Sequence, residues 1–157
     1  MPLYRSLSDR LRNQHEAIRN IIYGLDEKRL TAKPEPGKWS IHDNIAHLTK
    51  LQTLYIQRIN KIISEKEPFL QNYVPENDKE FEDWQKLKTE KLLERMDNDR
   101  KQIYNAIIEL RDEELARIGV HSTMGRLTLA DWMESMLLHE AHHIRAIFNL
   151  VHTTGTK

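Results

Sequence analysis

The chain contains no cysteine among its 157 residues. This absence excludes a disulfide-stabilised fold, a thiolate metal site, an iron–sulfur cluster and a cysteine nucleophile. Any thiol chemistry would therefore have to use a thiol that a substrate or cosubstrate brings to the protein.

Long apolar runs and an excess of one charge are also missing. No stretch approaches the roughly 18 apolar residues that a membrane-spanning helix needs, and the N-terminus carries Arg5 where a secretory signal would be apolar. The 24 basic and 24 acidic side chains give a formal net charge of zero, which argues against the basic surface of a nucleic-acid-binding protein. We therefore expect a cytoplasmic protein that binds neither membranes nor nucleic acids.

Glycine and proline are scarce, with five residues of each. Four stretches contain neither of them: 3–23, 38–67, 76–118 and 126–154. An all-β sandwich needs turn residues roughly every 8–12 positions, and this chain cannot supply them. The scarcity predicts an all-α protein with four long helices.

Apolar residues within these stretches recur every three or four positions, as they do along one face of an α-helix. We place the first helix at about 3–25, the second from Ser40, the third at about 77–110 and the fourth from Thr128. Four amphipathic helices with short connections predict an antiparallel four-helix bundle. We expect it to form a single domain over residues 1–157.

Two of the expected helices begin with matching capping signals. Asp43 follows Ser40 by three residues, and Asp131 follows Thr128 by the same spacing. At this spacing the two side chains can bind the exposed amides of the first turn. The pattern therefore fixes where the second and fourth helices begin.

Two other segments are less regular. The third helix would be unusually long, so we expect a bend near residues 96–100. Residues 112–127 contain Gly119 and Gly125 and are predicted to form an ordered loop.

Histidine is the residue type in this chain that is most useful for metal binding. There are eight: His15, His42, His47, His121, His139, His142, His143 and His152. His139 and His143 stand four apart, so their side chains lie on the same side of a helix and could bind one metal ion at about 2.0–2.1 Å. On a helical wheel both lie at one edge of the apolar stripe and point into the bundle, whereas His142 faces away. His47 lies on the shoulder of the second helix's stripe.

The pattern leaves two interpretations of these three histidines open. A shared metal ion would satisfy three imidazoles at once, but ordinary histidines at the edge of the core would give the same pattern. We expect His15 at the edge of the first helix's apolar stripe, on the surface or at the edge of the core, with a position facing the metal pocket as the alternative. Three further histidines are expected in solvent or loops: His42, His121 and His152. The tryptophans are expected to pack in the core or at the bundle ends, with substrate stacking as the alternative; they are Trp39, Trp84 and Trp132.

Glu140 falls in the middle of the fourth helix's apolar stripe. A carboxylate there is costly unless it is paired or hydrogen-bonded. Three roles fit this position: orienting a metal-binding histidine, acting as a general base, or forming one end of a buried ion pair. Glu140 is therefore our candidate catalytic residue, with the ion pair as the alternative.

Two known metal motifs match this segment only in part. Residues 139–143 have the His-Glu-x-x-His pattern of zinc proteases, but few residues follow for a third ligand, and Ala146 stands where a metzincin needs glycine. Glu140 and His143 match the Glu-x-x-His element of di-iron bundles, which requires a second copy, and the chain has none. Neither a metalloprotease nor a di-iron protein is expected.

The segments that lead into the second and fourth helices resemble those of a known family. Pro36-Gly37-Lys38-Trp39-Ser40 precedes the helix with His47, and Gly125-Arg126-Leu127-Thr128-Leu129 precedes the helix with His139 and His143. This joint pattern resembles the DinB/YfiT-like superfamily over nearly the whole chain. The resemblance implies a four-helix bundle, often dimeric, that binds a divalent metal, typically zinc or nickel, through three histidines. Matched by position, these would be His47, His139 and His143.

The resemblance also implies a set of functions. Some members are thiol S-transferases that use bacillithiol or mycothiol, one branch performs a thiol-dependent isomerisation, and many are damage-inducible or stress-associated. We expect a homodimer that transfers a low-molecular-weight thiol to a small electrophilic substrate. Two alternatives remain: a hydrolase that uses metal-bound hydroxide assisted by Glu140, and a non-catalytic metal- or ligand-binding stress protein.

Overall fold

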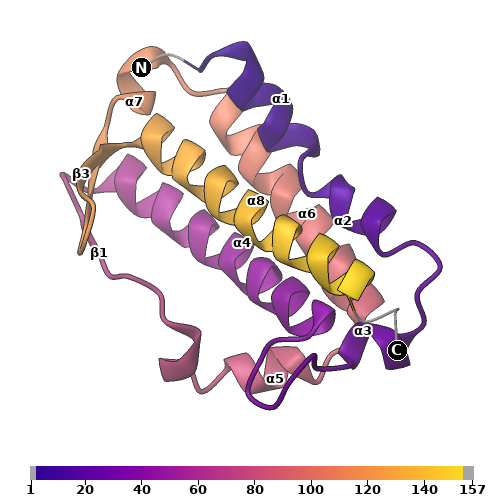
Figure 1. Ribbon diagram of the computed structural model, residues 1–157. Coiled ribbons are helices and arrows are strands. Elements are labelled where there is room, and N and C mark those ends of the chain that lie inside the picture. The colour runs from indigo at the N-terminus through magenta and orange to yellow at the C-terminus, as the bar shows by residue number, and fades with distance from the viewer. Residues whose placement is uncertain (1–2, 154–157) are drawn as a thin grey trace.

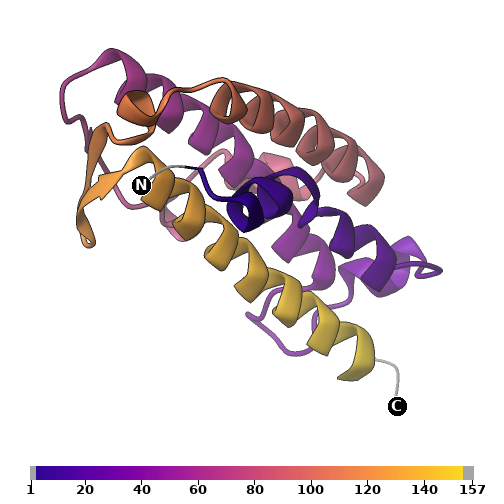
Figure 2. The same ribbon diagram turned by 90° about the horizontal axis from the view of Figure 1, so that it is seen from above.

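The predicted four-helix bundle is confirmed in the computed structural model, which describes residues 3–153. The ends of the expected domain, 1–2 and 154–157, lie outside the described residues. Its long elements are α1 (Arg5–Asn13) continued by α2 (Glu16–Ile21), α4 (Ile41–Ser64), α6 (Thr89–Ile108) and α8 (Leu129–Thr153). Figures 1 and 2 show these helices packed side by side along one common direction. None of the described helices has the length and apolar character needed to cross a membrane.

The connectivity of the bundle includes a long crossover. Helix α4 packs against both α6 and α8; it runs antiparallel to α8 but in the same direction as α6 (Figure 1). The chain therefore returns along the bundle between α4 and α6, which a purely antiparallel arrangement would not require. This crossover contains β1 (Phe69–Leu70), a 3₁₀ turn (Pro75–Asn77) and α5 (Phe81–Gln85).

The first helix is divided, whereas the sequence predicts one helix over 3–25. Helix α1 ends at Asn13 and α2 begins at Glu16. At the break, the Gln14 amide donates hydrogen bonds to the backbone oxygen of Leu137 and to Glu140. Apolar periodicity continues across the break, which is why the pattern does not reveal it. A further short helix, α3 (Glu27–Thr31), follows.

The third helix is interrupted earlier than predicted. The break falls between α5 and α6, and α6 runs without interruption through the expected bend at 96–100. Side-chain contacts hold the start of α6: the Thr89 hydroxyl donates to Glu27 at 2.9 Å and lies 2.7 Å from Nδ1 of His42. Both partners come from distant parts of the chain, so no local signal marks the break.

Residues 112–127 are not a loop, and this prediction was wrong. They form α7 (Asp112–Leu115), β2 (Ile118–His121) and most of β3 (Gly125–Thr128), and β1 adds to β2 to give the sheet order β1-β2-β3. The sheet closes one end of the bundle (Figure 1). Gly119 is required there, because a Cβ would lie 2.9 Å from Ile62 and from Trp132. The strands are too short to show a period of two.

Both predicted caps are confirmed. At the start of α4, Asp43 N donates to the Ser40 hydroxyl and Ser40 N donates to the Asp43 carboxylate. At the start of α8, Thr128 and Asp131 make the same reciprocal pair. The two helices that carry the three matched histidines therefore have fixed N-termini.

Candidate metal centre

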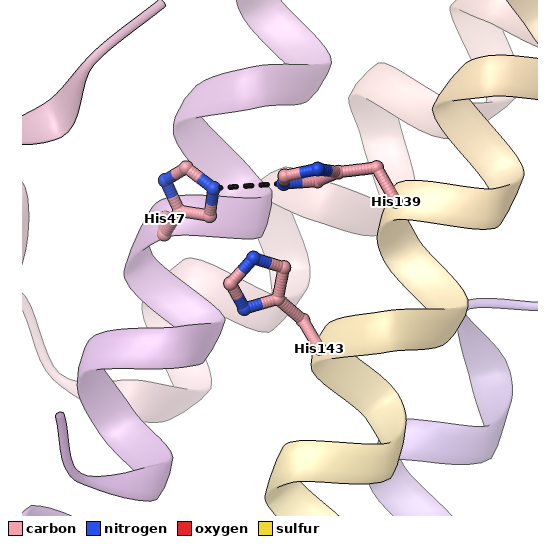
Figure 3. A group of neighbouring side chains, drawn as sticks. All are labelled: His47, His139 and His143. Carbon is pink, nitrogen blue, oxygen red and sulfur yellow. Dashed lines mark hydrogen bonds between the residues drawn. The ribbon is translucent and has the colours of Figure 1, made fainter.

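His47 on α4 and His139 and His143 on α8 come together across the interface of these two helices (Figure 3). One ring nitrogen from each lies within 4.8 Å of the others. Nε2 of His47 is 3.0 Å from Nε2 of His139, and the His143 ring centroid is 4.7 Å from both other centroids. The structure thus gathers all three residues that the family resemblance matches to metal ligands.

The group lies at the edge of the bundle. His47 is buried, His143 is partly buried and His139 is exposed, so one side of the group is open to solvent. The helical wheel predicts that His139 points into the bundle, whereas the structure leaves it exposed at the edge. His142 is exposed, as predicted.

The environment keeps these imidazoles neutral at physiological pH. Burial, followed by the neighbouring His143 and His139, lowers the pKa of His47 to about 3. Burial, then His139 and His142, lower the pKa of His143 to about 4. The pKa of His139 is lowered as well, mainly because its ring is partly removed from water although the residue as a whole is exposed. Each ring therefore retains a lone pair for a metal ion, because only a neutral imidazole is a ligand.

Three aromatic rings lie close to the histidine group. The Trp39 ring lies 5.0 Å from His47 and 5.9 Å from His143, measured between centroids. Tyr73 and Phe81 lie 5.9 Å and 6.3 Å from His47. Trp39 was expected to pack in the core or at a bundle end, with substrate stacking as the alternative. Tyr73 and Phe81 belong to the crossover and its helix α5, and nothing in the sequence placed them at the histidines.

The donor set fits a divalent metal ion. Two nitrogens bound to one zinc ion at 2.0–2.1 Å lie about 3.3 Å apart, close to the observed 3.0 Å between His47 and His139. Nδ1 of His143 bonds to Asn44 at 2.8 Å, whereas Nδ1 of His47 is buried without a partner. Three neutral nitrogens from two capped helices would hold the ion and leave coordination positions free on the exposed side.

Glu140 is engaged elsewhere. Its carboxylate pairs with the Arg100 guanidinium, and both side chains are 1% exposed. Gln14 and Gln52 donate to its two oxygens at 3.0 Å and 3.3 Å. Among the roles considered for Glu140, the structure shows the buried ion pair. A catalytic role for Glu140 stays a prediction.

The remaining histidines lie apart from this group. His42 and His121 are buried, contrary to expectation. The two ring nitrogens of His42 contact Thr89 and the backbone oxygen of Gln85, and His121 packs against Trp132 at 5.3 Å. His42 thus lies at a contact between elements that are distant in sequence, whereas the partners of the His121 ring are within 11 residues of it. His152 is exposed, as predicted.

His15 is buried at the break between α1 and α2. Its side chain is 7% exposed, Nδ1 has no hydrogen-bond partner, and Nε2 lies 3.4 Å from an Asp97 oxygen. Burial, followed by the nearby Arg100 charge, lowers the pKa of His15 to about 4, although Asp97 acts in the opposite direction.

This low pKa makes a pH-dependent contribution to folding stability. Between pH 6.5 and about 4 the unfolded chain binds a proton at His15 that the folded protein does not bind. The contribution is present above pH 6.5 and is lost as the pH falls toward 4, by on the order of 2–3 kcal/mol. We expect His15→Leu to flatten the pH dependence of the unfolding free energy, measured in urea at pH 7 and pH 5 with chelator present. Equal pH dependence in both proteins would contradict this assignment.

Comparisons with known proteins agree with this architecture. The sequence profile of the DinB superfamily matches residues 10–147. The chain is also 27% identical over 144 residues to YuaE, an uncharacterized protein of Bacillus subtilis (strain 168), covering 80% of this chain and 85% of YuaE.

Two solved structures from Bacillus subtilis share the fold. YfiT, described as a probable metal-dependent hydrolase with an unusual four-helix bundle topology, matches with a TM-score of 0.84 at 19% identity, over 97% of this chain and 87% of YfiT. The DinB-like protein YjoA matches with a TM-score of 0.61 at 15% identity, over 98% of this chain and 94% of YjoA. Since the profile covers most of the sequence and the bundle and histidine group accompany it, the chain belongs to the DinB superfamily.

Proposed function

We propose that His47, His139 and His143 bind one divalent metal ion, zinc or nickel, and that the protein uses it to transfer a low-molecular-weight thiol to an electrophile. The observation that carries the proposal is the convergence of three neutral imidazole nitrogens within 4.8 Å. When bound, such an ion supplies Lewis acidity that favours the ionised form of an incoming thiol.

The surroundings of the histidines favour a thiol as the nucleophile. The chain has no cysteine that would compete for the ion. In addition, the one carboxylate proposed as a base, Glu140, is occupied by Arg100 and two glutamines. A thiol, with a pKa of about 8.5, ionises with far less assistance than water, with a pKa of about 15.7.

The chain's own residues would shape the substrate's approach. Trp39, Tyr73 and Phe81 lie beside His47 and would limit the access of water to it. His139 borders the solvent-exposed side, so both substrates would enter there. We further propose that the protein acts as a homodimer on small-molecule substrates.

A metal-dependent hydrolase is the second candidate, supported by the description of YfiT and its close structural match. A thiol–electrophile assay separates the candidates. With bacillithiol and monobromobimane, we expect the conjugation rate to exceed the uncatalysed background in metal-loaded protein and to return to background after treatment with EDTA.

The same protein sample should then be tested with activated esters and amides. Metal-dependent hydrolysis without thiol conjugation would favour the hydrolase and contradict thiol transfer. Metal binding without either activity would favour the non-catalytic binding protein. Protein that binds no divalent metal would overturn the proposal as a whole.

A further inference from the structure

Asn44 links the N-terminus of α4 to the histidine group. It lies one turn before His47, and its side chain is 4% exposed. The amide contacts two groups: Nδ2 is 2.8 Å from the backbone oxygen of Ser40, and Oδ1 is 2.8 Å from Nδ1 of His143. Asn44 therefore connects a helix cap on α4 to a ring on α8.

The orientation of this amide is determined by chemistry. A backbone oxygen can only accept hydrogen bonds, so the group that faces Ser40 must be the NH₂ of Asn44. The flipped amide would place two oxygen atoms 2.8 Å apart, because the contact distance to Ser40 would be retained. Oδ1 must then face His143.

The orientation of the amide in turn fixes the proton on His143. Oδ1 is an acceptor, so the hydrogen bond exists only if Nδ1 of His143 carries the proton. In a neutral ring, the lone pair is then on Nε2. Figure 3 shows one nitrogen of His143 facing the space between His47 and His139 and the other pointing away. The ring thus presents its lone pair where the three histidines meet.

The anchor of this arrangement is rigid. The Ser40 carbonyl belongs to the cap that Ser40 and Asp43 form, and Asp43 also accepts a hydrogen bond from Gln85 at 2.7 Å. By contrast, Nδ1 of His47 is buried without any partner. A hydrogen bond to Nδ1 therefore controls the tautomer of His143, and His47 has no such bond.

We propose that Asn44 is a positioning residue of the metal site, which holds His143 in the Nδ1–H tautomer so that Nε2 faces the ion. The role in metal binding rests on the proposed function, whereas the tautomer of His143 is a property of the metal-free protein and can be measured without a metal ion. Outer partners of metal-binding histidines typically contribute about 10–100-fold to metal affinity.

The first test is the tautomer in metal-free wild-type protein, read from two-bond ¹H–¹⁵N correlations of the imidazole rings at neutral pH. We expect His143 to be protonated on Nδ1. In Asn44→Leu, which has similar size but no acceptor, we expect the Nε2–H tautomer to appear. Asn44→Asp loses the NH₂ that faces Ser40 but keeps an acceptor for His143, so it should retain the Nδ1–H form. A wild-type ring protonated on Nε2 would overturn the proposal without any variant.

The second test is Zn²⁺ affinity by competition with a chromophoric chelator. We expect Asn44→Leu to raise the Kd about 10–100-fold and Asn44→Asp to raise it less. Thr49→Val is the matched control, because Thr49 is also buried on α4 but bonds the backbone oxygen of Ile45; it should leave both the tautomer and the affinity unchanged. An unchanged tautomer and affinity in Asn44→Leu would refute the role of Asn44. Absence of Zn²⁺ binding in wild type, with the Nδ1–H tautomer present, would instead refute the proposed function.

Discussion

Replacing His139 and His143 together with alanine is expected to abolish stoichiometric binding of Zn²⁺ or Ni²⁺. The double variant removes two of the three nitrogens that converge between α4 and α8, and a single imidazole cannot hold the ion tightly. We expect the Kd to rise at least about a thousandfold, which corresponds to about 4 kcal/mol. Elemental analysis of purified protein and a chelator competition titration measure this effect.

The chain offers a matched control on the same helix. His152 is exposed and lies nine residues beyond His143 on α8, so His152→Ala removes a histidine from this helix without changing the group. This control should bind metal like the wild type. Metal content that is unchanged in the His139 and His143 variant would refute the site.

Adding and removing the metal should also change the stability of the wild type. An ion at 100 times its Kd stabilises the folded state by about 2.7 kcal/mol, which for a chain of this length corresponds to a Tm increase of about 5–10 °C. Addition of EDTA should reverse the increase. The His139 and His143 double variant should show neither change, which connects the stabilisation to these side chains.

The second large effect is expected at the buried ion pair. Glu140→Leu leaves the Arg100 guanidinium in the core without its carboxylate, and Gln14 and Gln52 lose an acceptor. Removal of one partner from a buried pair typically costs about 3–5 kcal/mol. We expect a loss of this size in the free energy of unfolding, measured in urea. Glu94→Leu breaks the exposed pair with Lys91 on α6 and should change stability by less than about 0.5 kcal/mol.

A double variant separates structure from catalysis at Glu140. Arg100→Met with Glu140→Leu removes both charges, so we expect it to recover much of the lost stability. If Glu140 acts only through the ion pair, the folded double variant retains metal binding and turnover. If turnover is lost while metal binding and folding persist, Glu140 has the catalytic role predicted from the sequence. If Glu140→Leu alone were as stable as the wild type, the ion pair would not contribute to stability.

The capped helices could be predicted from the sequence because their signals are local. Ser40 with Asp43, and Thr128 with Asp131, satisfy first-turn amides within four residues, so short-range chemistry determines where α4 and α8 begin. The breaks at Gln14 and before Thr89 could not be predicted. Both depend on side chains that bond to distant segments.

The same distinction explains which parts of the site could be predicted. His139 and His143 stand one turn apart on a single helix, so their proximity follows from helical geometry alone. The helical wheel places His47 at the edge of its own helix's apolar stripe, but only the packing of α4 against α8 brings it to the other two histidines. Tyr73 and Phe81 reach the site because the crossover returns alongside α4, and no periodicity records that path.

The sequence by itself determined the helical class, the starts of α4 and α8, the absence of a protein thiol and the pair of histidines on one helical face. Only the tertiary structure decided that His47 joins that pair, that Asn44 contacts His143, and that Glu140 is paired with Arg100. The physical reason is the range of the interactions. Propensity, capping and helical period act within a few residues, whereas these contacts join segments that are 40 to 99 residues apart, which only the packing of the bundle brings together.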